Sequence, residues 1–243
     1  MKQPFKFKQF TVKQDKCAMK VGTDAVLLGA WVSLKEDLYS ILDIGSGTGI
    51  IALMLAQRSD VETIDAIEID ENAYEQCVDN FEASNWADRL FCYHAAFDEL
   101  LEEIEDKYEL IVCNPPFYEP PISKTNGSFP IDSSRKKARF YDALPFNDLI
   151  SGVSQLLDSS GTFATVIPYN EEENFIKIAA KNKLFPKRVT RVKGRENAKI
   201  KRSLLEFTFI KQEIDNNQLT IETERHVYTS AYIDLTKDFY LKM

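Results

Sequence analysis

Ile41-Leu42-Asp43-Ile44-Gly45-Ser46-Gly47-Thr48-Gly49 is the stretch that decides the fold. Its first four residues are apolar enough for a buried parallel strand, and Ile50–Arg58 has the apolar spacing of a helix. Glycines at alternate positions let the backbone bend sharply and approach a ligand closely. A strand, a glycine-rich turn and a helix in this order predict an α/β domain with a ligand at the head of the helix.

The spacing of the turn indicates which ligand it suits. A dinucleotide fingerprint has two residues between its second and third glycines, whereas this turn has one. Asp43 would repel a pyrophosphate and suits a ligand with an ammonium group. Glu68 follows Gly45 by 23 positions, at the end of a strand predicted over 61–69. That is close to the spacing of about 20 residues at which an acid binds ribose hydroxyls. The two acids together predict an unphosphorylated adenosine.

Ile111-Val112-Cys113-Asn114-Pro115-Pro116-Phe117 is the second informative stretch. The apolar residues predict the end of a buried strand, and the two prolines end it because neither can donate to a ladder. The corner offers the amide oxygen of Asn114, the carbonyl of Pro115 and the aromatic face of Phe117. A planar amine could donate its two protons to the oxygens while its ring stacks on Phe117. The alternative is a plain turn, for which Asn-Pro and Pro-Pro are common.

Two further polar residues have two interpretations each. Thr23, after the break at Gly22, would either receive a carboxylate at a helix N-terminus or, like Asp24, simply cap that helix. Asp98 follows a strand predicted over 90–93, and it would accept from an adenine amine or cap an acidic helix over 98–105.

Composition narrows the class of protein. The chain has 243 residues, 44% of them hydrophobic, without an apolar run of about 20 residues, so no transmembrane helix is expected. The N-terminus lacks the apolar core of a signal peptide. Four cysteines stand far apart and two histidines are present, so neither a disulfide framework nor a metal site is expected. We expect a cytoplasmic protein.

The net charge of −8 argues against indiscriminate coating of nucleic acid. Positive charge nevertheless gathers in two blocks: residues 1–20 carry six lysines against one acid, and residues 177–202 carry eleven Lys/Arg against one. Such blocks are either solvated surface or a site for a polyanion at one edge of an otherwise acidic body.

Alternating strands and helices through five strands, with a late antiparallel pair, predict a doubly wound, mostly parallel seven-stranded sheet ending in an antiparallel hairpin. We expect one domain over 1–243: an N-terminal arm and helix (1–38), a cofactor-binding and catalytic core (39–212) and a C-terminal extension (213–243). The segment 118–143 lacks apolar periodicity and is expected to be a functional loop.

Across about residues 20–210 this pattern resembles the class I S-adenosylmethionine-dependent methyltransferases, whose fold is Rossmann-like. The segment 17–31, the turn Asp43–Gly49, the corner Asn114–Phe117 and Ala138-Arg139-Phe140 resemble more closely the bacterial tRNA(Val) adenine-37 N6-methyltransferase family. The resemblance implies S-adenosylmethionine as cofactor, a tRNA substrate and methylation of the adenosine beside the anticodon. It implies catalytic roles for Asn114, Pro115 and Phe117, and cofactor contacts from Thr23, Asp43, Gly45, Gly47, Gly49, Glu68 and Asp98. We expect a monomer.

Two alternatives remain open on the sequence. The same corner serves guanine-N2 methylation of rRNA by the same fold, although enzymes of that kind tend to carry a duplicated domain. A non-catalytic RNA-binding protein could keep the fold as a scaffold, but the complete set of glycines and acids argues against a decayed site.

Overall fold

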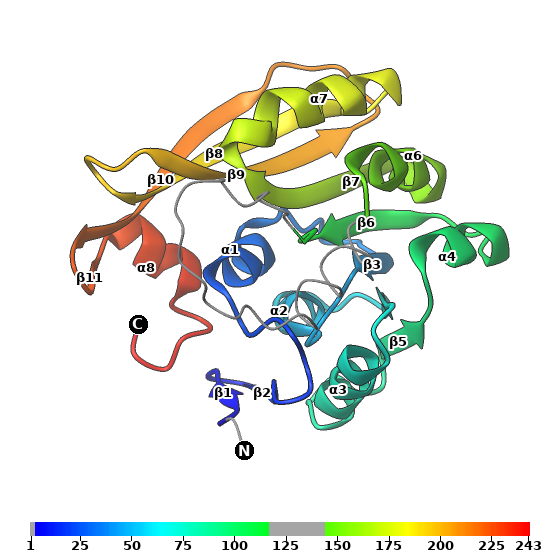
Figure 1. The fold of residues 1–243 in the computed structure, drawn as a ribbon, viewed down its shortest axis with the longest axis horizontal. Helices are drawn as coiled ribbons and strands as arrows, with labels where there is room; N and C mark the ends of the chain where they lie inside the picture. The colour runs from blue at the N-terminus through cyan, green and yellow to red at the C-terminus, as the bar shows by residue number, and fades with distance from the viewer. Residues whose placement is uncertain (1–2, 117–143) are drawn as a thin grey trace, which may run out of the picture.

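The computed structural model describes residues 3–116 and 144–243, so Phe117 and the predicted loop 118–143 lie outside the described residues. Within the described part, nine strands form one sheet in the order β11-β10-β8-β9-β7-β6-β3-β4-β5 (Figure 1). These strands are β3 (Ser40–Ile44), β4 (Thr63–Glu68), β5 (Leu90–His94), β6 (Tyr108–Cys113), β7 (Leu157–Pro168), β8 (Phe185–Arg195), β9 (Ile200–Thr208), β10 (Asp215–Glu224) and β11 (Val227–Tyr228).

Most strands of the sheet run in the same direction, so their carboxyl ends lie at the same edge of the sheet. The strands β5, β4, β3, β6 and β7 are all parallel, and β9 runs antiparallel to β7 and to β8. The strand β8 therefore points the same way as β6, and β10 pairs parallel with β8. The predicted antiparallel hairpin is confirmed as β8 and β9. The predicted count of seven is too low because β10 and β11, from the C-terminal extension, join the sheet beyond β8.

Helices cover both faces of the sheet, which confirms the doubly wound class (Figure 1). Alternate residues of each strand face opposite cores, as Ile41 and Leu42 of β3 do. One core includes residues of α1 (Thr23–Trp31), α2 (Ile50–Arg58), α3 (Glu71–Glu82) and α8 (Ser230–Thr236). The other includes residues of α4 (Phe97–Glu103), α6 (Phe146–Leu156) and α7 (Glu172–Lys181), which follows the short 3-10 helix η1 (Tyr169–Glu171).

The N-terminal arm packs against the end of the chain. Its short strands β1 (Phe5–Lys6) and β2 (Thr11–Val12) pair antiparallel with each other. The ring of Phe7 stacks on that of Tyr240 with centroids 5.8 Å apart, and Lys8 Nζ donates to the backbone oxygen of Lys237. Both ends of the chain therefore lie on the α1 side of the sheet (Figure 1). The division into arm, core and extension stays a prediction.

None of the helices in residues 3–116 and 144–243 has the length and apolar character needed to cross a bilayer. The same residues hold no group of three His, Cys, Asp or Glu side chains placed to bind a metal ion.

Candidate active site

The glycine-rich turn connects β3 to α2, and all three of its glycines have positive φ: 70° at Gly45, 56° at Gly47 and 75° at Gly49. A residue with a Cβ is destabilised by about 1–2 kcal/mol in this left-handed conformation. Gly49 is also packed, because a Cβ there would lie 2.5 Å from Cε1 of Phe81. At Gly45 and Gly47 a Cβ would meet nothing within 4 Å. The turn therefore presents two glycines to open space and fixes the third against α3.

Glu68 connects this turn to the end of β4. Its two carboxylate oxygens accept from the backbone N–H groups of Gly47 at 2.7 Å and Asp70 at 2.9 Å. The side chain is buried. Burial raises the pKa of Glu68, and the hydrogen bonds from backbone N–H groups partly oppose that rise. Each oxygen has lone pairs to spare for hydroxyl donors, so the acid is held ready for a diol.

Asp43 lies beneath the turn and is completely buried. Its Oδ2 accepts from the backbone N–H of Ala52, at 3.3 Å, in the first turn of α2. Gly49, the N-cap of α2, has no side chain, so Asp43 supplies the missing cap. Its Oδ1 has no hydrogen-bond partner among the described residues.

Burial raises the pKa of Asp43 from 3.8 to about 7, with the Ala52 hydrogen bond opposing the rise and the charge of Glu68 adding to it. A buried acceptor without a donor is costly, and a cationic donor would relieve that cost. The structure thus gives Asp43 a capping role that the sequence did not predict, and it leaves one oxygen available for a ligand.

Asn114 and Pro115 follow β6, which lies between β3 and β7. Cys113 is level with Ile44 of β3, so the corner stands at the same sheet edge as the glycine-rich turn. Pro115 is buried and Asn114 is partly exposed. Since β4 is two strands from β6, Glu68 and Asn114 belong to strand ends about 10 Å apart. The third predicted catalytic residue, Phe117, lies outside the described residues.

Neither Thr23 nor Asp98 is the N-cap residue of its helix. Gly22 is the N-cap of α1, and Asp24 instead binds the Arg202 guanidinium at 2.8 Å. Ala96 is the N-cap of α4, so Asp98 is an exposed residue of the first turn. The capping interpretation is therefore wrong for Thr23, Asp24 and Asp98 alike. No hydrogen bond within the described part joins Thr23 or Asp98 to the turn, and their cofactor contacts stay predictions.

Ile69 and His94 lie beside Glu68, at the ends of β4 and β5, and neither was predicted from the sequence to be a site residue. Ile69 is 50% exposed at the end of β4, and its backbone oxygen lies 3.1 Å from Nε2 of His94. The His94 ring stacks on that of Tyr74 with centroids 5.2 Å apart. The exposed side chain of Ile69, directly after the predicted ribose acid Glu68, could have been noticed in the sequence, because an apolar surface at a strand's carboxyl end is suited to contact a base.

A mostly parallel sheet, with a glycine-rich turn after β3 and an Asn-Pro-Pro corner after the neighbouring strand β6, has the arrangement of a class I methyltransferase. Residues 21–126 match the methyltransferase small domain family. A predicted O-methyltransferase from Agrobacterium tumefaciens has the same fold: its TM-score is 0.66 at 17% identity, over 89% of this chain and 96% of that one.

Relatives of full length define the family more narrowly. A tRNA1(Val) (adenine(37)-N6)-methyltransferase of Christiangramia forsetii is 58% identical over 99% of both chains. The protein of that name from Bacteroides fragilis is 46% identical over 100% of both, and the one from Pectobacterium carotovorum is 42% identical over 98% of this chain and 94% of its own. The chain belongs to the tRNA1(Val) (adenine(37)-N6)-methyltransferase family.

Proposed function

We propose that this protein methylates N6 of adenosine 37 in tRNA1(Val), using S-adenosylmethionine as the methyl donor. The observation that carries the proposal is the sharing of one sheet edge by two sites. A buried acid and a glycine-rich turn suit an adenosine there, and the Asn114–Pro115 corner stands two strands away. Relatives with this activity in their names cover nearly the whole chain.

The residues present fit the proposed cofactor. Glu68 would accept from both ribose hydroxyls, and the Oδ1 of Asp43, which has no partner among the described residues, would suit an ammonium group. Gly45 and Gly47 leave open the space that a Cβ would take. The exposed side chain of Ile69 offers an apolar contact for the adenine. When bound, S-adenosylmethionine supplies an electrophilic methyl group on a sulfonium.

The chain's own residues account for activation of the substrate amine. An adenine amine is a poor nucleophile because its lone pair is delocalised into the ring. The Asn114 side-chain oxygen and the Pro115 carbonyl would accept its two protons and so favour a pyramidal nitrogen. This is positioning and electrostatic stabilisation, and it needs no imidazole base. Removing the base from its stack costs a few kcal/mol, and stacking on Phe117 would return about 1–3 kcal/mol.

The test is methyl transfer from labelled S-adenosylmethionine to bulk tRNA and, separately, to rRNA, with the modified nucleoside identified by mass. The proposal predicts N6-methyladenosine in a valine tRNA. Methylguanosine in rRNA would keep the fold and chemistry but overturn the substrate. Cofactor binding with no methyl transfer to either RNA would favour a binding role.

Two narrower parts of the proposal are a cytoplasmic location and a monomeric state. Sedimentation of the purified protein with and without tRNA tests the second, since a dimer at working concentrations would contradict it.

A further inference from the structure

A groove of about 930 Å³ opens between the N-terminal arm, α8 and the carboxyl ends of β8 and β10. Of the predicted site residues that the structure describes, only Thr23 lines it. Neither the glycine-rich turn nor Asn114 lines the groove, although at Thr23 the groove borders the predicted cofactor site. The volume of the groove is that of a small-molecule or nucleotide site.

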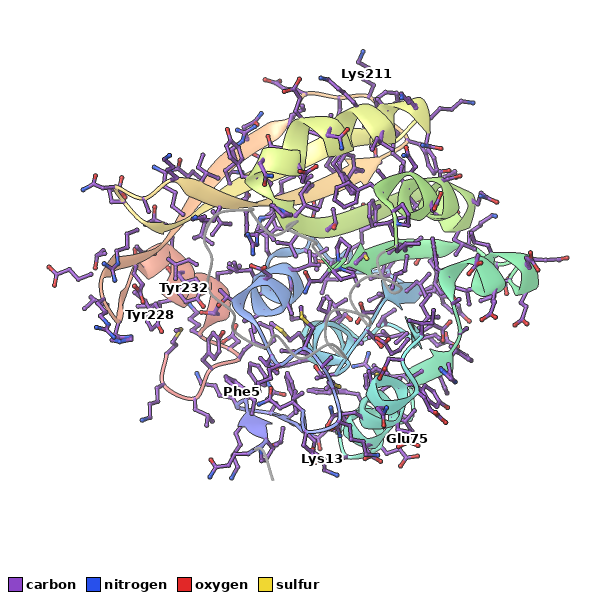
Figure 2. The ribbon with its side chains drawn as sticks, in the orientation of Figure 1. Phe5, Lys13, Glu75, Lys211, Tyr228 and Tyr232 are labelled. Atoms are coloured by element: carbon purple, nitrogen blue, oxygen red, sulfur yellow. The ribbon has the colours of Figure 1, made fainter. Side chains whose placement is uncertain are left out.

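Aromatic rings form much of the groove wall. Tyr228 of β11 and Tyr232 of α8 lie with ring centroids 5.2 Å apart, while Phe5 and Tyr240 meet edge to face at 6.1 Å. Tyr232 is buried, but Tyr228 is 36% exposed. Figure 2 shows Tyr228 and Tyr232 beside each other on the C-terminal elements, with Phe5 on the arm. The ring of Tyr228 therefore packs against Tyr232 and remains partly exposed, so a ligand in the groove can contact it.

The charge of the groove is opposite to that of the whole chain. Among the described residues that line it, Lys6, Arg195 and Lys242 stand against a single acidic side chain, that of Glu222. The Oε2 atom of Glu222 lies 3.5 Å from Nε of Arg195. Lys8 Nζ donates at 3.2 Å to the backbone oxygen of Met243 at the groove's edge. A chain with a net charge of −8 therefore concentrates cations here. Lys6 and Arg195 come from the two basic blocks, which meet at this groove.

The groove opens on the same sheet edge as the candidate active site. Both β8 and β10 run in the direction of β6, so Arg195 and Glu222, near their carboxyl ends, face the edge where Asn114 stands. Three to four strand spacings, or about 14–19 Å, separate β6 from β8 and β10. The register places Thr190 of β8 level with Asn114, so Arg195 lies five residues, or about 16 Å, further along its strand. The groove is therefore roughly 20–25 Å from Asn114. A folded RNA loop reaching Asn114 can place another of its nucleotides at this distance.

We propose that this groove binds an unpaired nucleotide of the substrate RNA, with its base against Tyr228 and its backbone phosphates beside Lys6 and Arg195. The inference rests on the proposed function, since it deepens the recognition of the same RNA. Aromatic faces combined with cations are the usual means of binding single-stranded nucleic acid without base-specific contacts.

The test measures binding and turnover in three groove variants. Tyr228→Ala should weaken binding of a synthetic tRNA1(Val) anticodon stem-loop roughly 5- to 150-fold, the range for losing one stacked base. Tyr228→Phe should restore it. Lys6→Ala should lower the slope of log Kd against log salt by about one. In turnover, KM for tRNA should rise in the Ala variants, while kcat and the affinity for the cofactor stay unchanged.

Matched controls lie away from the groove. Tyr39→Ala removes an exposed tyrosine next to the amino end of β3, and Lys211→Ala removes an exposed lysine far from the groove (Figure 2). Both should behave as the unmodified protein.

Groove variants that bind the stem-loop as the unmodified protein does would overturn the inference even if tRNA is methylated. If no RNA is methylated but the stem-loop still binds through Tyr228, the proposed function fails and the groove stands. An unmodified protein that does not bind the stem-loop would overturn both.

Discussion

Replacing Asp43 with asparagine should stabilise the cofactor-free protein while weakening its hold on the cofactor. Asp43 is completely buried, and its Oδ1 has no partner among the described residues. Its pKa is about 7 in the folded protein against an ordinary 3.8, which corresponds to a cost of roughly 4 kcal/mol for the charged form above pH 7. Asparagine keeps the shape and an oxygen for the Ala52 N–H, but it never ionises.

The sign follows from proton binding. Because the folded pKa is raised, the folded protein holds a proton that the unfolded chain has lost between about pH 4 and pH 7. Asp43 therefore lowers stability progressively as pH rises through that window, and the full cost is present above it. In Asp43→Asn the cost is absent. The gain in unfolding free energy over the unmodified protein should grow by about 2 kcal/mol between about pH 5.5 and about pH 8.5.

Urea unfolding of both proteins across this range measures the difference directly. Calorimetry with S-adenosylmethionine should then show weaker binding by the variant, since the proposed ammonium contact loses its charge. A stability difference that does not change with pH, or a variant less stable than the unmodified protein above pH 7, would refute the assignment of a strained buried charge to Asp43.

Three other substitutions separate binding from folding. Gly47→Ala, in open space, should cost about 1–2 kcal/mol of stability from positive φ yet weaken cofactor binding strongly, as melting curves and calorimetry would show. Gly49→Ala adds overlap with Phe81 and Cys77, worth about a further 1–3 kcal/mol, and equal melting temperatures for the two variants would contradict this packing account. Glu68→Gln should lose about 1.5–3 kcal/mol of cofactor affinity, because it removes a charged hydroxyl acceptor. It should also lose about 1–3 kcal/mol of stability, because its amide NH2 cannot accept from one of the two backbone N–H groups that Glu68 satisfies. Unchanged cofactor affinity in that variant would contradict the ribose role.

The sequence predicted correctly those structural features that depend on residues close to one another along the chain. The helix predicted over Ile50–Arg58 has those bounds in the structure. Asp70, a residue type common at helix N-termini, caps α3 by accepting from the backbone N–H of Ala73 at 2.8 Å. Both features depend on residues only a few positions apart, namely a glycine before a helix and an Asx residue before an apolar stripe.

Sequence reasoning failed where a distant residue intervenes. Asp24 binds Arg202, 178 positions away, and Gly22 becomes the cap of α1. Strand β10 reads as a polar run because it lies near the sheet's edge and Leu219 is its sole buried residue, so no alternation marks it as a strand. The Asn114 corner could be recognised from its motif, but its distance from Glu68 required the strand order.

The most direct test of the account is the single-turnover rate of methyl transfer to tRNA1(Val) by Asn114→Ala, with Asn114→Asp as the control that keeps an acceptor oxygen. The account predicts a loss of at least about 100-fold for the Ala variant, partial recovery in the Asp variant, and cofactor affinity close to that of the unmodified protein. A rate within a few fold of the unmodified protein, or a loss explained by weaker cofactor binding, would contradict the role given to Asn114.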